Sequence, residues 1–219
     1  MNKNRVILAM STLPGNAKFT KNVKPERFKW REKDTEGQEY ICQLEPTSKM
    51  IREREGSLDE VVILATKETR KKDLDDGTLS VVDFYIERMG LNSENTKVIG
   101  IEEDDFIPAI SEAVEIIRQY WKDNDQKVNL WIDTQGSFRN INLVLNAVIT
   151  LLEPDGIKPR GIYSLNYIRG RELQLIEDQT ETYKIFHFVS GINEFTRSGR
   201  AEQLTDYYHH TGKAIPEVI

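Results

Sequence analysis

Several residue types and patterns that mark whole classes of protein are scarce or missing in this chain of 219 residues. Cys42 is its single cysteine, which excludes an internal disulfide and a cluster of thiolate metal ligands. The three histidines are His187, His209 and His210, and none has the H-x-E or H-x-x-x-H spacing of a metal site. No apolar run approaches the roughly 18 residues of a membrane span. We therefore expect a cytoplasmic protein with no metal, no cofactor and no membrane partner.

Three sequence motifs of common nucleotide-binding and hydrolytic sites are also missing. The turn "PGNAKF" lacks the G-x-G-x-x-G spacing of a dinucleotide site, and neither the phosphate loop of NTPases nor the G-x-S-x-G elbow of hydrolases occurs. The net charge of −6 argues against binding to duplex DNA, because such binding requires many phosphate contacts from lysine and arginine. A small anionic ligand held by a few local donors remains compatible with this charge.

Apolar runs of strand type alternate along the chain with segments of helical period. The strands are expected at residues 5–10, 60–66, 96–101, 128–133 and 160–168, and the helices at 47–55, 80–90, 105–121, 141–152 and 183–199. This alternation predicts an α/β fold of Rossmann type, with a mostly parallel central sheet and helices on both faces. The charged segment 67–77 is expected to be a solvated loop.

Two further features modify this pattern. Period-2 alternation on both sides of "KDTEG" predicts a β-hairpin inserted after the first strand, at about residues 26–45, in which Phe28 faces Tyr40. The segment 172–177 predicts a strand antiparallel to 160–168. We expect residues 1–199 to form one domain and residues 200–219 to be a linker to a missing effector domain or a dimer contact.

Some local details are also predicted. Thr47 or Ser48 has the side chain to cap the helix over 47–55. On the helix over 105–121, Ile107, Ile110, Val114 and Ile117 share one face. In the helix over 183–199, Phe186, Val189 and Phe195 are expected to point inward.

Polar residues follow three of the predicted parallel strands, at the carboxyl edge where sheets of this type bind ligands. Gly15 and Gly136 let backbone N–H groups approach a ligand, and Arg139 adds a cationic fork suited to phosphate. The set comprises Ser11, Thr12, Gly15 and Asn16, then Thr66, Lys67 and Thr69, and finally Asp133, Thr134, Gln135, Gly136, Ser137 and Arg139. It predicts a pocket for phosphates and base edges. The alternative is that Ser137 only caps a helix and Arg139 is a surface residue.

Four stretches together resemble a known family. They are "VILAMSTLPGN", "DEVVILATKET", "WIDTQGSFRNINLVLNAVITLLE" and "FHFVSGINEFTRSGRAEQL". They resemble the CRISPR-associated Rossmann fold (CARF) domain, in the branch named for a D-x-T-H-G motif, and the resemblance covers nearly the whole chain. Asp133, Phe138 and Arg139 match this motif best, whereas its histidine is absent here.

The resemblance implies a sensor of cyclic oligoadenylate, the second messenger of type III CRISPR antiviral defence. We expect the ring, a cyclic tetra-adenylate, to bind across the two-fold axis of a homodimer and to signal to an effector domain. The positions that match the family's ligand contacts are Ser11, Thr12, Gln135, Gly136, Ser137 and Arg139. The chain is too short to hold an effector as well, and the arginine-to-histidine motif of the common ribonuclease partner precedes none of its histidines.

Two other functions stay open at this point. The first is a metal-independent ring nuclease that cleaves the messenger by attack of a 2′-OH on its phosphate, with Ser11, Thr12 and Arg139 as candidate catalytic residues. The absence of a histidine near the motif favours binding over cleavage, because no obvious general acid or base is at hand. The second is a Rossmann-like domain that binds another nucleotide.

Overall fold

A sheet of eight strands organises the first of two compact units, which comprise residues 1–178 and 179–219. The computed structural model describes residues 2–10, 25–30, 36–42, 44–72, 79–102, 104–135 and 140–212. The strands are β1 (Lys3–Met10), β2 (Glu26–Lys29), β3 (Gln38–Tyr40), β4 (Glu60–Thr66), β5 (Thr96–Ile101), β6 (Val128–Asp133), β7 (Pro159–Asn166) and β8 (Leu173–Asp178). The helices of this unit are α1 (Glu45–Glu55), α2 (Lys67–Arg70), α3 (Val81–Met89), α4 (Ile107–Asp123), α5 (Ile141–Leu152) and the 3-10 turn η1 (Glu153–Asp155).

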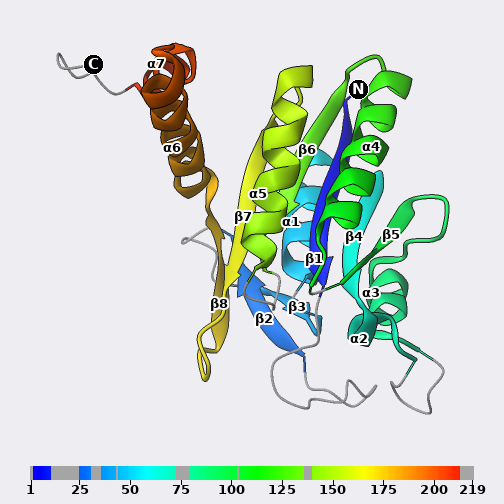
Figure 1. The fold of residues 1–219 in the computed structure, drawn as a ribbon. Coiled ribbons are helices and arrows are strands. Elements are labelled where there is room, and N and C mark those ends of the chain that lie inside the picture. The colour runs from blue at the N-terminus through cyan, green and yellow to red at the C-terminus, as the bar shows by residue number, and fades with distance from the viewer. Residues whose placement is uncertain are drawn as a thin grey trace. The chain divides into compact units, whose positions relative to one another are not determined.

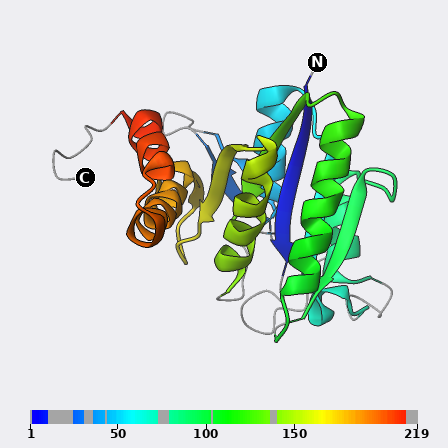
Figure 2. The same ribbon diagram turned by 45° about the horizontal axis from the view of Figure 1, so that its top comes forward.

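The order of strands confirms the predicted α/β fold. Across the sheet the order is β3-β2-β8-β7-β6-β1-β4-β5, and the block from β7 to β5 is parallel throughout. Helices α4 and α5 cover one face of this block, and α1 and α3 cover the other (Figures 1 and 2). All seven residues of β4 are buried, because a central strand of a parallel sheet is covered on both faces. Strand β8 runs antiparallel to β7, as predicted.

The predicted hairpin is present and extends the same sheet. β2 and β3 pair antiparallel with Phe28 opposite Gln38, and the rings of Phe28 and Tyr40 lie 5.9 Å apart in an edge-on arrangement. On its other side β2 runs parallel to β8, with Phe28 opposite Gln174. The hairpin therefore adds two strands at one edge, beyond β8, and its aromatic residues join the core under α1 and α3.

The start of α1 differs from the prediction. The helix begins at Glu45, and neither Thr47 nor Ser48 caps it; both lie buried inside it. The reason is the carboxylate of Glu45, which reaches back and accepts hydrogen bonds from the backbone N–H groups of Ile41 (3.3 Å) and Cys42 (3.0 Å). Ser48 instead hydrogen-bonds the hydroxyl of Tyr85 on α3, at 2.7 Å.

Other helix ends follow the sequence more closely. Ser80 and Asp83 form a capping box at the start of α3, and Gly90 ends this helix in the left-handed conformation. On α4, Val114 and Ile117 are buried as expected, but Ile107 is 72% exposed, because it stands in the first turn, beyond the covered part of the face. The segment after β4, expected to be a loop, begins with the short helix α2.

The second unit is a pair of helices, α6 (Thr180–Ser198) and α7 (Glu202–Thr211). They pack through Gly191, where an added Cβ would lie 2.8 Å from the backbone nitrogen of Leu204, and through Phe188, whose ring centre is 5.1 Å from that of Tyr207. Val189 and Phe195, expected to point inward, are exposed, because other residues of α6 face α7. The predicted boundary at residue 199 falls between these two helices.

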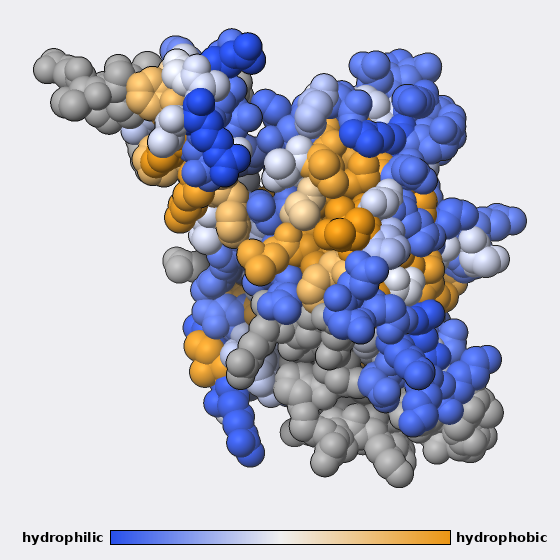
Figure 3. Space-filling model, viewed as in Figure 1, coloured by the Kyte–Doolittle hydropathy of each residue, from blue (hydrophilic) through white to orange (hydrophobic). Residues whose placement is uncertain are grey.

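The face formed by α4 and α5 carries an apolar area over α5 among mostly polar surroundings (Figure 3). Leu143 and Leu151 on α5 contribute to its exposed apolar surface. Within the described ranges, no helix combines the length and the apolarity that crossing a bilayer demands.

Candidate functional site

The carboxyl ends of β1, β4 and β6 meet at one edge of the sheet. In the pairing register Met10 lies opposite Ala65, one residue before the end of β4, and Leu8 lies opposite Asp133, the last residue of β6. The last residues of these three strands therefore lie side by side. Seven of the predicted site residues lie in the segments that follow these strands but outside the described residues: Ser11, Thr12, Gly15, Asn16, Gly136, Ser137 and Arg139.

At the end of β4, Thr66 acts within its own turn. Its hydroxyl accepts from the backbone N–H of Thr69 at 3.4 Å and so caps α2, while the Thr69 hydroxyl donates to the Thr66 carbonyl at 2.9 Å. Both side chains are buried. Lys67, next to them, is exposed. A ligand in solvent can therefore reach the ammonium group of Lys67 but not the two threonine hydroxyls.

At the end of β6, Asp133 holds the turn that follows. It is fully buried, and its Oδ1 accepts from the backbone N–H of Gln135 at 2.7 Å, the local bond of an Asx turn. Burial raises the pKa of this carboxyl to about 7, while the Gln135 N–H and Thr47 on α1 lower it in part. No described donor meets hydrogen-bond geometry at Oδ2. The carboxyl of Asp133 therefore does not face solvent, and its role in this geometry is to hold the turn at Gln135 in place.

Thr134 and Gln135 continue β6 toward its neighbour β7. Thr134 donates to the carbonyl of Tyr163 from its backbone nitrogen at 2.8 Å and from its hydroxyl at 3.1 Å. Gln135 is reached by Ser164, whose hydroxyl donates to Oε1 at 3.1 Å. Two residues of the predicted motif thus lie against β7.

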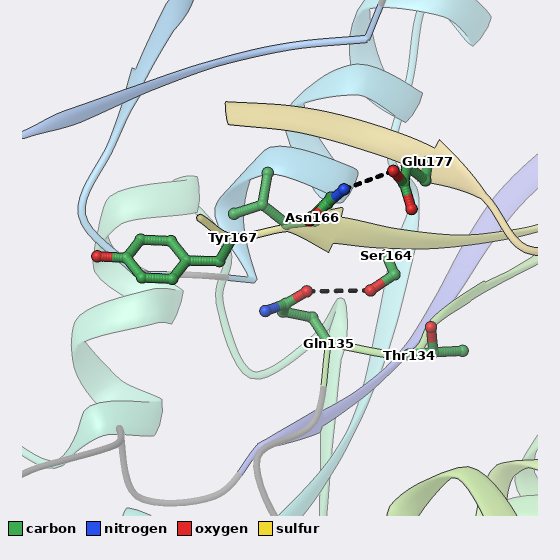
Figure 4. A pocket seen from close by; sticks show the side chains of 7 residues that line it. Thr134, Gln135, Ser164, Asn166, Tyr167 and Glu177 are labelled. Atoms are coloured by element: carbon green, nitrogen blue, oxygen red, sulfur yellow. Dashed lines mark hydrogen bonds between the residues drawn. The ribbon is translucent and has the colours of Figure 1, made fainter. Parts of the chain in front are cut away.

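A polar pocket opens at this point (Figure 4). Its volume is about 400 Å³, within the range of small-molecule sites. It lies over the ends of β6 and β7 and reaches β8. The lining consists of Thr134, Gln135, Ser164, Leu165, Asn166, Tyr167 and Glu177.

Five of these lining residues were not predicted from the sequence. A signal for two of them does exist in "YSLNY", where Ser164 and Asn166 alternate with the buried Leu165. Alternation of this kind places two polar side chains on one face of a strand. Glu177 comes to the same place only through the antiparallel pairing of β8, which sets it opposite Ser164.

Hydrogen bonds hold the polar groups of this pocket in place. Asn166 donates from Nδ2 to the carboxylate of Glu177 at 2.6 Å, and the Tyr167 hydroxyl donates to Glu26 on β2 at 3.1 Å. Burial and the bond to Glu26 raise the pKa of Tyr167, so it stays a neutral donor. No lysine or arginine is among the described lining residues. The pocket therefore offers neutral hydrogen-bonding groups, a carboxylate and an aromatic ring.

Metal ligands do not gather in the part of the chain that the structure describes, where no three side chains of histidine, cysteine, aspartate or glutamate come close enough to share an ion.

Comparison with known proteins gives similarities among solved structures alone. No protein-family model matches the sequence, and no curated protein matches it. Among solved structures, the chain is similar to "Enterococcus italicus Csm6 bound to cyclic hexa-2'-fluoro-hexa-dAMP", with 9% sequence identity and a TM-score of 0.47. The similarity covers 94% of this chain and 49% of that one, so the chain spans about half the length of the Csm6 protein.

Proposed function

We propose that this protein is a sensor of cyclic oligoadenylate in type III CRISPR defence, with the ring bound at the carboxyl edge of the sheet. The observation that carries the proposal is the shared edge of β1, β4 and β6. The segments after these strands hold the residues that match the CARF motifs, and the register of the strands brings their starting points together. The polar pocket beside Gln135 adds room for part of a nucleotide at the same edge.

The chemistry of the ligand divides between two parts of this edge. Phosphates need cations and backbone N–H groups, which Lys67, Arg139 and the glycines at 15 and 136 supply. Bases need neutral donors and acceptors, which the pocket over β7 and β8 supplies. A cyclic oligoadenylate contains both kinds of group in alternation.

In this proposal two copies of the chain form a homodimer, and a cyclic tetra-adenylate lies across the two-fold axis. A symmetric ring on a symmetric interface makes every contact twice. The ligand then favours one arrangement of the dimer, and an effector domain responds to that arrangement, provided that the two arrangements differ in affinity for the ring.

The test is calorimetric titration of the full chain with cyclic tetra-adenylate, with cyclic hexa-adenylate and linear tetra-adenylate as comparison ligands. We expect the cyclic tetramer to bind most tightly, with one ring for two chains. Arg139→Ala should weaken binding roughly ten-fold or more, because an arginine bond to phosphate is charge-assisted. Arg118→Ala is the matched control: it removes a surface arginine of α4 that pairs with Asp155, and it should bind like the wild type.

The same samples decide between binding and cleavage. In the presence of EDTA, a ring recovered intact after prolonged incubation supports the sensor, whereas a linear product ending in a 2′,3′-cyclic phosphate establishes a ring nuclease. If no cyclic oligoadenylate binds or raises the melting temperature, the proposal is wrong, and the result supports the alternative of a Rossmann-like domain that binds another nucleotide.

A further inference from the structure

The polar pocket over β6, β7 and β8 has the chemistry of a base-reading site. We propose that it selects adenine through three contacts: Gln135 donates to a ring nitrogen, Asn166 accepts from the exocyclic amine, and Tyr167 stacks on the base. This inference rests on the proposed function, since it assigns one part of the same ligand to named residues.

The charge of the lining decides which part of a nucleotide enters. Glu177 contributes a carboxylate to the pocket, and the other described lining residues carry neutral side chains. A carboxylate in a partly buried pocket repels a phosphate and attracts groups with N–H bonds. The phosphates of a bound nucleotide therefore stay outside, toward Lys67, and a neutral base that carries an amine enters.

The two amides of the pocket are held in a defined orientation. A carboxylate only accepts hydrogen bonds, so the contact of 2.6 Å with Glu177 must involve the Nδ2 of Asn166 and turns its Oδ1 away as an acceptor. The hydroxyl of Ser164 donates to Oε1 of Gln135 at 3.1 Å, and Figure 4 shows the amide nitrogen turned away from Ser164. Among the described residues, none accepts from that nitrogen and none donates to Oδ1 of Asn166. The pocket thus presents one fixed donor and one fixed acceptor.

Adenine carries the complementary pair of groups. Its exocyclic amine donates, and a ring nitrogen on either side of that amine accepts, which is why side-chain amides recognise this base. Tyr167 supplies the third contact: the residue lines the pocket and is 42% exposed, and its hydroxyl donates a hydrogen bond to Glu26. Exposed aromatic rings of this kind are the usual platforms for unstacked bases.

The experiment removes the exocyclic amine of adenine from the ligand and the side-chain amide of Asn166 from the protein, first separately and then together. The full chain is titrated with cyclic tetra-adenylate and with the same ring built from purine riboside, which lacks only the amine. We expect the amine-free ring to bind the wild type roughly ten-fold more weakly. With Asn166→Leu, the two rings should bind equally, because the group that reads the amine is gone.

Further variants separate stacking and donation from general damage to the fold. Tyr167→Ala should weaken binding of cyclic tetra-adenylate roughly ten-fold, while Tyr167→Phe should retain most of it. Gln135→Leu should weaken both rings alike, since both keep the ring nitrogen. Gln119→Leu, on the exposed face of α4, is the matched control and should change neither titration.

Each outcome separates this inference from the function on which it rests. If both rings bind the wild type equally and Asn166→Leu binds as the wild type does, the pocket does not read adenine although the sensor stands. If no ring binds, the sensor function is wrong. The base site is then tested by adding adenosine or purine riboside at millimolar concentration and measuring the changes in the NMR shifts of the protein. A preference for adenosine that Asn166→Leu abolishes supports the base site, and equal binding overturns it.

Discussion

Arg88 on α3 donates to both carboxylate oxygens of the buried Glu45 on α1, from Nε at 3.0 Å and from Nη2 at 2.8 Å. Lys49 adds a third bond at 2.6 Å, and the backbone N–H of Cys42 a fourth at 3.0 Å. One carboxylate therefore joins two helices to the end of the inserted hairpin. This contact lies on the face of the sheet opposite α4 and α5, and it holds together the layer that covers Trp131 and Tyr163.

Replacing this carboxylate should destabilise the protein. Burial raises the pKa of Glu45, but the hydrogen bonds from Arg88, Lys49 and Cys42 outweigh it and hold the pKa below its ordinary value. The stabilisation is therefore present above pH 4.5 and is lost as the pH falls through the lowered folded-state pKa. Glu45→Gln should cost about 3 kcal/mol of unfolding free energy in urea at neutral pH. Glu181→Gln removes an exposed carboxylate that pairs with Lys184, and it should cost under about 1 kcal/mol; equal losses would contradict the assignment.

The pair of Arg5 on β1 and Glu60 on β4 gives a second prediction. Arg5 is fully buried, forms an ion pair with Glu60 and stacks its guanidinium 3.4 Å from the ring centre of Tyr120. Burial lowers the pKa of Arg5, and Glu60 raises it in part. Glu60→Leu should cost about 3–5 kcal/mol, because it leaves a buried cation without its anion. The double variant Arg5→Leu, Glu60→Leu should be more stable than Glu60→Leu alone in a double-mutant cycle of urea denaturation; a double variant that is less stable refutes this reading.

Asp133 should make stability depend on pH in the opposite sense to Glu45. Burial raises its pKa from 3.8 to about 7, so the neutral carboxyl is favoured in the folded state. Its contribution is fully present below about pH 4 and is lost as the pH rises toward 7. Compared with Asp133→Asn, the wild type should therefore lose on the order of a few kcal/mol of unfolding free energy across this interval. Chemical denaturation of both proteins at closely spaced pH values measures this, and parallel curves would exclude a buried, raised-pKa carboxyl.

Local patterns predicted those elements whose stability comes from their own residues. The apolar run ending in Asp133 indicates a buried strand. The segment 80–90 indicates a helix that ends at Gly90, and the structure shows that its start is fixed just as locally, by the capping box of Ser80 and Asp83. The start of α1 was missed for the opposite reason. Its first turn is set by the carboxylate of Glu45, which is held by Arg88 from another helix, and no local rule contains that contact.

The candidate site divides in the same way. That polar segments follow β4 and β6 is readable from the sequence, and Rossmann topology then places them at one edge. The pocket beside them needs three residues to meet: Gln135, which follows the end of β6, Ser164 on β7 and Glu177 on β8. Their meeting depends on the pairing of β6 with β7 and of β7 with β8.

By itself, the sequence determined the class of fold, the parallel core, the hairpin and the edge that carries the motif, because hydrophobic period and turn residues act over short distances along the chain. Only the tertiary structure decided that β2 lies beside β8, that Tyr167 donates a hydrogen bond to Glu26, and that a polar pocket lies next to Gln135. The physical reason is that strand pairing joins backbone groups of any sequence. Side chains more than a hundred positions apart, such as Glu26 and Tyr167, therefore become neighbours although no local sequence pattern predicts their contact.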